Sequence, residues 1–226
     1  MTATSHKLDT VKIMQHNIDS VRFERGICLD SKSYHHENLK NTLIEKGIEI
    51  ISLEGDANLS LRKVASACGV SHAAPYAHFK NKNDLINAMQ EHVASELSKT
   101  LMHVIETCSE KEEILTYLGK AYVIFFMDNP HYFSFLFSRT EVMVDFSYNA
   151  DPANNYRPYE IFRQTAIQAL NPTGLSHEKM NDLIITMFAL VHGLASIATM
   201  KNTTYNEKWE DKIETLLTLF SIGRNE

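Results

Sequence analysis

Four basic side chains lie in a stretch free of acidic residues and could hold the phosphates of a nucleic acid. Residues 57–83 contain Arg62, Lys63, Lys80 and Lys82 and no Asp or Glu. Clustered Lys and Arg displace the counterions that surround a nucleic-acid backbone, and this release supplies most of the affinity for phosphate. Because the whole chain has a net charge of −6, we expect phosphate contacts to be confined to this stretch.

The spacing of residues 61–71 predicts a helix-turn-helix. Such a motif needs a small residue where its two helices cross, which Ala65 supplies, and a glycine four residues later for the positive φ of the turn, which Gly69 supplies. Val70 then fills the gap behind the turn. This spacing places residues 71–78 on a second helix, with its N-terminal residues facing base edges in the major groove. The same spacing also occurs in plain helix packing, so the pattern alone leaves that alternative open.

Aromatic and methionine side chains are concentrated in residues 117–136 and 156–170. Such a stripe is typical of a hydrophobic core, and it can also line a ligand cavity. A cavity here would favour an apolar or amphipathic molecule, with Arg163 and His192 as candidate polar groups. For His192, a structural hydrogen bond at a helix crossing is the alternative. The residues expected to bind this ligand are Tyr122, Phe126, Phe133, Phe162, Arg163, Phe188 and His192.

The elements that must position these residues are all predicted to be helices. Apolar residues recur at helical spacing in residues 39–51, 85–105, 114–127, 156–170, 183–200 and 209–222, and no alternating strand pattern intervenes. Ser60 is the predicted N-cap of a short second helix and Ser71 that of a third, over residues 72–79. Residues that precede a proline leave helical geometry, so breaks are expected before Pro130, Pro152 and Pro172. The chain is therefore predicted to be all-α.

This pattern divides the chain into three parts. Residues 1–33 show no sustained period and are predicted to be an arm, with Met14 as an alternative start. Residues 34–82 form the predicted helix-turn-helix domain, and residues 83–226 form a larger predicted helical domain that contains the residues of the candidate ligand cavity. The helix that begins near residue 82 is expected to link the two domains.

Composition argues against several classes of function. The three cysteines are scattered without metal-ligand spacing, so neither a disulfide framework nor a zinc site is expected. No glycine-rich phosphate loop, nucleophile elbow or metal-binding His pair appears, so we expect no enzyme and no cofactor. The longest apolar stretch, residues 121–127, is too short for a bilayer span, which predicts a cytoplasmic protein without a membrane partner. Eleven histidines keep a metal-responsive regulator open, and a helical interaction protein that has lost DNA binding is a further alternative.

The residues around the motif resemble the TetR family of transcriptional regulators. Tyr76, His78, Phe79 and Lys82 match its Tyr-x-His-Phe run and the lysine that follows. The resemblance implies a three-helix N-terminal module in which Tyr76 and Lys82 contact phosphates, while residues 72–74 face the groove. Phe79 is expected in the core. The residues expected at the DNA are Ser60, Arg62, Ser71, His72, Ala73, Ala74, Tyr76, His78, Lys80 and Lys82.

The second half is similar to one large branch of that family. Phe188, His192 and Gly193 occupy the positions of a Trp-x-x-x-His-Gly signature, with Phe188 in place of the tryptophan. The resemblance implies that helices over residues 176–200 and 209–222 pair with a second copy, so that a homodimer reads a palindromic double-stranded DNA operator. It also implies a repressor whose small-molecule effector moves the linking helix and weakens operator binding. Four small residues permit a close helix approach: Gly193, Ala195, Ser196 and Ala198.

Overall fold

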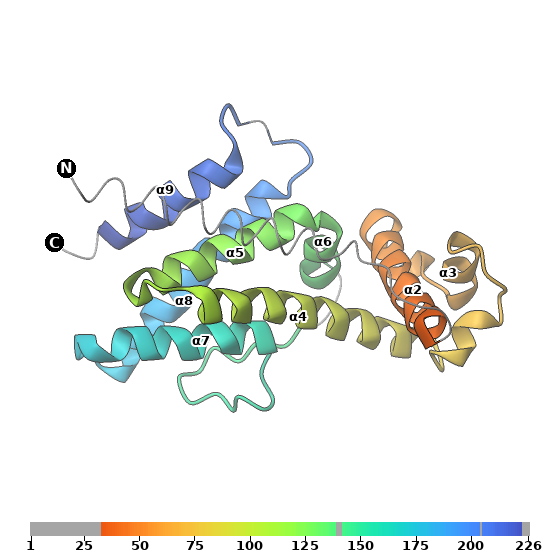
Figure 1. Cartoon of the computed structure of the whole chain (residues 1–226), viewed down its shortest axis with the longest axis horizontal. Coiled ribbons are helices and arrows are strands. Elements are labelled where there is room, and N and C mark those ends of the chain that lie inside the picture. The colour runs from red at the N-terminus through yellow and green to blue at the C-terminus, as the bar shows by residue number, and fades with distance from the viewer. Residues whose placement is uncertain (1–32, 139–141, 204, 223–226) are drawn as a thin grey trace. The chain divides into compact units, whose positions relative to one another are not determined.

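A computed structural model describes residues 33–138, 142–203 and 205–222 (Figure 1). Within these ranges the chain forms eight α-helices and four short 3-10 helices, and no strand. By its contacts the chain divides into two units, residues 1–40 and 41–226, and every contact given below lies within the second. The predicted all-α fold class is confirmed. The arm predicted for residues 1–33 lies almost entirely outside the described residues.

The N-terminal helices are α2 (Ser33–Glu54), α3 (Leu61–Ala67) and the 3-10 helix η3 (Ala74–Ala77). Leu43, Ile48 and Ile51 bury one side of α2, as expected from their helical spacing. Gly55, with φ of 88°, follows the end of α2. The Ser60 hydroxyl accepts a hydrogen bond from the Lys63 N–H at 3.1 Å, which confirms the predicted cap of α3.

One long helix, α4 (Lys82–Thr107), continues from the N-terminal helices into the C-terminal ones. The Asn81 side chain caps its first turn by accepting from the Asp84 N–H at 3.0 Å. The first half of α4 packs against α2 so closely that a Cβ added at Gly47 would lie 2.8 Å from the Met89 sulfur. Further along, its buried residues meet α5 and α7. The boundary expected at residue 83 therefore falls at the start of a continuous helix.

The C-terminal helices pack around α5 (Ile114–Asp128), in which every residue from Ala121 to Phe126 is buried. Its neighbours are α4, α7 (Arg157–Leu170), α8 (His177–Ala198) and α9 (Trp209–Ile222). These spans agree with the predicted ones. A further helix, α6 (Pro130–Ser138), begins at the proline that was expected only to end α5. Proline is tolerated in the first turn because the N–H that it lacks has no helical acceptor there.

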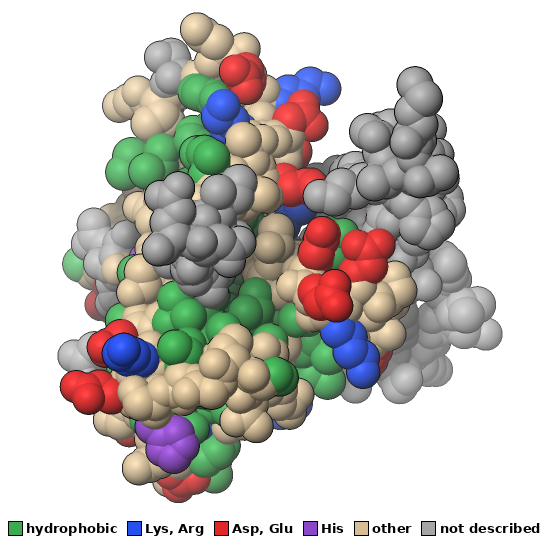
Figure 2. Space-filling view, turned by 90° about the vertical axis from the view of Figure 1, so that its left-hand side faces the viewer, with side chains coloured by type: hydrophobic (Ala, Val, Ile, Leu, Met, Phe, Trp, Pro, Cys, Tyr) green, Lys and Arg blue, Asp and Glu red, His purple; other side chains and the backbone are tan. Residues whose placement is uncertain are grey.

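Several apolar residues of the helix α8 are not buried in the single chain. In the described part of the chain it alone has the length and composition of a membrane span, and 33% of that span is buried. Ala189 and Ile197 lie exposed on one side of it, and a Cβ added at Gly193 would meet nothing within 4 Å. Hydrophobic side chains also reach the surface on the face drawn in Figure 2, between charged ones.

Candidate nucleic-acid interface and aromatic cluster

The turn between α3 and η3 has the geometry that the sequence predicts for a helix-turn-helix. Gly69 has φ of 68°, and no atom lies within 4 Å of a Cβ built there, so the backbone alone requires glycine. The Val70 N–H donates to the Ala65 carbonyl at 3.0 Å, and the Gly69 N–H donates to the Ser66 carbonyl at 3.2 Å. Ala65 is fully buried at the crossing.

The predicted helix over residues 72–79 is wrong in type and length. The structure has a 3-10 helix, Ala74–Ala77, preceded by a turn. An α-helix starting at His72 would need the N–H of residue 75 to reach the Ser71 carbonyl, and Pro75 has no N–H. The carbonyl of Ser71 instead accepts from the Ala74 N–H at 2.9 Å, and the Tyr76 N–H donates to Ala73 at 3.1 Å. Because these hydrogen bonds span three residues rather than four, residues 71–78 form a compact turn structure and not an α-helix.

Most of the residues predicted at the DNA are exposed, on α3, on this turn and just after it. Tyr76 is 55% exposed, whereas Phe79, at 2%, is in the core as expected. Ser60 is exposed but serves as the cap of α3, and Ala74, His78 and Lys82 are half-buried. The exposed candidates will be called the reader surface, which consists of Arg62, Ser71, His72, Ala73, Tyr76 and Lys80.

Acidic residues just before the basic stretch pair with two of its four cations. Lys63 forms an ion pair with Glu54. Lys82 lies 3.0 Å from the Asp56 carboxylate and donates to the Asp56 carbonyl at 2.7 Å. A phosphate would have to compete with Asp56 for Lys82, while Arg62 and Lys80 are exposed on the reader surface.

Five of the seven predicted ligand residues come together between α5, α6 and α8. They are joined by Phe137, and the six will be called the aromatic cluster: Tyr122, Phe126, Phe133, Phe137, Phe188 and His192. The Phe126 and Phe133 rings lie 5.2 Å apart and Phe137 lies 4.6 Å from His192. Phe162 is peripheral, with its ring 6.1 Å from Phe188. Sequence reasoning missed Phe137, which follows Phe133 by four residues and would have been found had α6 been predicted.

Burial keeps the polar groups of this cluster uncharged. It raises the pKa of Tyr122 and lowers the pKa of His192, because a low-dielectric environment disfavours the charged form of either side chain. The Tyr122 hydroxyl and His192 Nδ1 are 3.1 Å apart, the hydrogen bond at a helix crossing that was the alternative for His192. Beside the cluster, the hydroxyls of Tyr156 and Tyr159 are buried without a hydrogen-bond partner among the described residues.

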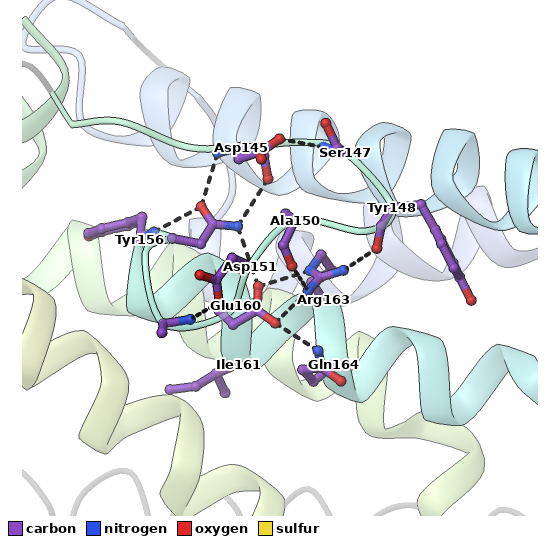
Figure 3. Close-up of polar contacts among 12 residues, drawn as sticks. Asp145, Ser147, Tyr148, Ala150, Asp151, Tyr156, Glu160, Ile161, Arg163 and Gln164 are labelled. Carbon is purple, nitrogen blue, oxygen red and sulfur yellow. Dashed lines mark hydrogen bonds and ion pairs between the residues drawn. The ribbon is translucent and has the colours of Figure 1, made fainter.

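Arg163 has a place different from the predicted ligand contact. It is 3% exposed, and Nε and Nη2 donate to the Glu160 carboxylate at 2.9 and 2.7 Å. Nη1 and Nη2 also donate to the carbonyls of Tyr148 and Ala150 at 2.6 and 3.2 Å (Figure 3). With its donors engaged in this way, Arg163 anchors residues 142–156 to α7 rather than facing a ligand.

Two sets of polar contacts, which sequence reasoning missed, connect α2 with α6. The Tyr132 hydroxyl donates to Glu45 Oε1, and His92 Nε2 of α4 lies 2.8 Å from the same oxygen. Nearer the end of α2, Ser52 Oγ and His131 Nδ1 are 3.0 Å apart. These partners are separated by 47, 79 and 87 positions in the chain, and isolated polar residues carry no local signal that would pair them.

The described cysteines and histidines do not form a metal centre. Across residues 33–138, 142–203 and 205–222, no group of three or more His, Cys, Asp or Glu could hold a metal ion. Cys68 and Cys108 are free and half-buried, and burial raises the pKa of both thiols. They are therefore thiols rather than thiolates at neutral pH.

Comparison with known proteins matches both halves of the chain to described families. Residues 43–89 match the model "Bacterial regulatory proteins, tetR family", and residues 115–220 match "Tetracyclin repressor-like, C-terminal domain". A TetR-family transcriptional regulator from Bordetella parapertussis has 14% identity and a TM-score of 0.60, covering 81% of this chain and 94% of its own.

Two further solved structures share the fold. A TetR-family regulator from Haemophilus influenzae has 21% identity and a TM-score of 0.53, with coverage of 80% of this chain and 96% of that one. The fatty acid degradation regulator FadR from Bacillus halodurans has 13% identity and a TM-score of 0.55, with coverage of 84% and 96%. At these identities the likeness concerns the fold alone.

Proposed function

Because the chain belongs to the TetR family of bacterial transcriptional regulators, we propose that it is a cytoplasmic homodimeric repressor. In this proposal it binds a palindromic operator and leaves it when a small apolar or amphipathic effector binds the C-terminal helices. The observation that supports DNA recognition is the exposure of Arg62, Tyr76 and Lys80 on the reader surface. All three lie in a stretch without acidic residues. A glycine turn of this geometry, combined with exposed cations and an exposed tyrosine, is typical of a surface that binds duplex DNA.

Each side chain of the reader surface, together with the half-buried Ala74 and Lys82, has a distinct part in the proposed contact. Tyr76 and Lys82 bind backbone phosphates and thereby fix the register of the protein on the duplex. His72, Ala73 and Ala74 face base edges, and Arg62 reaches the groove or backbone from α3. The His72 ring is held at 3.1 Å from the Ser66 hydroxyl, so it is already oriented before DNA binds.

Dimerisation is proposed to use the exposed side of α8 together with α9. Thr186, Ala189, Gly193 and Ile197 follow one another at intervals of three and four residues and so share one side of α8. On α9, Leu219 is 59% exposed. Small residues on such a stripe let two helices approach closely, and a two-fold axis would place two reader surfaces on successive half-sites.

The effector is proposed to bind at the aromatic cluster and the two tyrosines beside it. An uncharged environment of rings selects an apolar or amphipathic molecule. The buried hydroxyls of Tyr156 and Tyr159 have no partner within the described chain, and a buried donor left unpaired costs about 1–3 kcal/mol. An effector with one or two acceptors would remove that cost, which favours the bound state.

The proposed release from DNA is a population shift. An effector changes operator affinity only if it binds two arrangements of the protein unequally. The α4 helix packs on both the N-terminal and the C-terminal helices, and the contacts from α6 reach Glu45 and Ser52 of α2. Movement of α4 and α6 would therefore change the separation of the two reader surfaces.

Binding to DNA from the protein's own upstream region, measured by fluorescence anisotropy at two salt concentrations, tests this function. We expect tight, salt-sensitive binding that Tyr76→Ala weakens about tenfold or more, through loss of a phosphate contact. Tyr205, which is 40% exposed and lies before α9, provides the matched control Tyr205→Ala, which should bind like the wild type. Weak binding that neither salt, DNA sequence nor Tyr76→Ala changes would favour an interaction protein that has lost DNA binding.

A further inference from the structure

A pocket of about 510 Å³ lies where the C-terminal ends of α2, α5 and α8 meet the start of α6. This volume is within the range of small-molecule sites in proteins. Phe133 is the one member of the aromatic cluster that lines it, so most of the pocket is separate from the proposed effector site. Its lining residues are Ser52, Met127, Pro130, His131, Phe133, Ser134, Ser196, Ala198, Thr199, Met200 and Lys201.

The lining has an apolar part and a polar part. Met127, Pro130, Phe133 and Met200 supply a surface on which an apolar body can pack, while the hydroxyls of Ser134 and Ser196 supply hydrogen-bond donors. Lys201 is the cation of the pocket, and none of the lining residues is acidic. A ligand with an apolar body and one negative charge therefore complements the pocket.

The end of α8 does not oppose a negative charge in this pocket. Unpaired carbonyls at a helix C-terminus repel anions, but here threonine hydroxyls cover several of them. The Thr199 hydroxyl donates to the Ser196 carbonyl at 3.1 Å, and the Thr203 hydroxyl donates to the Ile197 carbonyl at 3.4 Å. Lys201 follows Met200 in the chain, so a full positive charge lies on this side of the pocket.

The pocket also lies between a helix of the proposed DNA-binding domain and a helix of the C-terminal domain. Ser52 belongs to α2, His131 belongs to α6, and their side chains are 3.0 Å apart. A molecule in the pocket touches both helices at once, and it stabilises the arrangement in which they lie together.

We propose that this pocket is a second ligand site, for an amphipathic monocarboxylate whose carboxylate pairs with Lys201 and whose apolar body packs on Met127 and Phe133. The site shares Phe133 with the proposed effector site at the aromatic cluster, and the rest of its lining is separate. It acts on α2 directly, without movement of α4.

Calorimetric titration of the full-length protein with decanoate, and with decanol as the uncharged control of equal chain length, tests this proposal. Decanoate should bind, and decanol should bind at least several-fold more weakly. Lys201→Glu should weaken decanoate binding about tenfold, since it replaces an attraction with a repulsion. Ala198→Trp should abolish binding by filling the pocket.

The control variant is Lys179→Glu, which reverses an exposed charge in the first turn of α8, at the opposite end of that helix from the pocket, and should bind decanoate like the wild type. Because Lys201 is exposed, Lys201→Glu decides the question even if Ala198→Trp fails to fold. The proposal is overturned if decanoate gives no binding heat, or if it binds Lys201→Glu as tightly as the wild type. The latter result would place decanoate elsewhere, for instance at the aromatic cluster.

Discussion

The hydroxyl of Tyr132 in α6 donates a hydrogen bond to the carboxylate of Glu45 in α2. His92 of α4 lies 2.8 Å from the same carboxylate oxygen, and its ring meets Tyr132 edge-on with centroids 6.1 Å apart. Three helices therefore meet at one carboxylate. Within the described part of the chain, this contact is one of two at which α6 binds α2, the first helix of the DNA-binding domain. Coupling between the DNA-binding domain and the C-terminal helices can therefore be measured at Glu45.

A double-mutant cycle of Tyr132→Phe and Glu45→Ala should reveal this coupling. Each single variant should lower the free energy of unfolding by about 1 kcal/mol, because a hydrogen bond to a half-exposed carboxylate is lost. The double variant should lose less than the sum of the two, and urea denaturation measures all three. Tyr76→Phe, at an exposed tyrosine, is the control and should be neutral. Strict additivity would show that the two side chains do not interact.

Ile197→Asp should convert the proposed dimer to a monomer. Ile197 is 43% exposed in the single chain, so the charge is tolerated in the monomer, whereas a buried unpaired charge in the interface costs several kcal/mol. Sedimentation velocity measures the change, and operator affinity should fall with it. Met102→Asp on α4, at a residue 39% exposed, is the matched control. A variant Ile197→Asp that still sediments as a dimer would exclude this side of α8 from the interface.

Glu160→Ala should be strongly destabilising, by about 3 kcal/mol, because it leaves the buried Arg163 without its counter-charge. Burial alone would raise the pKa of Glu160, but hydrogen bonds from Arg163 and Gln164 outweigh it and hold the pKa below the usual 4.5. Because the folded-state pKa is lowered, the stabilisation is full above the usual 4.5 and is lost as the pH falls through the folded-state pKa.

Thermal unfolding at pH 7 and at pH 3 checks both parts of this expectation. The difference between the wild type and Glu160→Ala should shrink at the lower pH. Gln164→Ala removes a neutral donor to the same carboxylate and should cost less at either pH. An equal loss at both pH values would contradict an ionised Glu160 in the folded protein.

His192 should make the protein less stable in mild acid. Burial lowers its pKa below the usual 6.5, so the unfolded chain takes up a proton before the folded protein does. Stability is therefore full above 6.5 and declines as the pH falls toward the folded-state pKa. His192→Phe should remove this decline, which denaturation between pH 7 and pH 5 measures. His177→Gln, at an exposed histidine, should keep it, and an unchanged profile in His192→Phe would contradict the assignment.

Features that depend on neighbouring residues could be predicted from the sequence. The period of apolar residues predicted α4, α5, α7, α8 and α9, because a helix repeats every 3.6 residues whatever it packs against. Ser60 as a cap and Gly69 in the turn followed from interactions that span three or four residues. The local signal failed at residues 72–79, where the missing N–H of Pro75 outweighs the expected helix.

Contacts between distant segments were decided by the tertiary structure alone. Arg163 looked like a ligand contact, and only the folded chain shows that carbonyls of residues 148 and 150 occupy it. Glu45 and Tyr132 are 87 positions apart, and nothing in either neighbourhood indicates the other. Helix periods and caps are set by hydrogen bonds within a few residues, whereas the partner of a buried polar group is set by how whole helices pack. The sequence by itself therefore determined the family and the reading motif, and the fold determined how the two halves are joined.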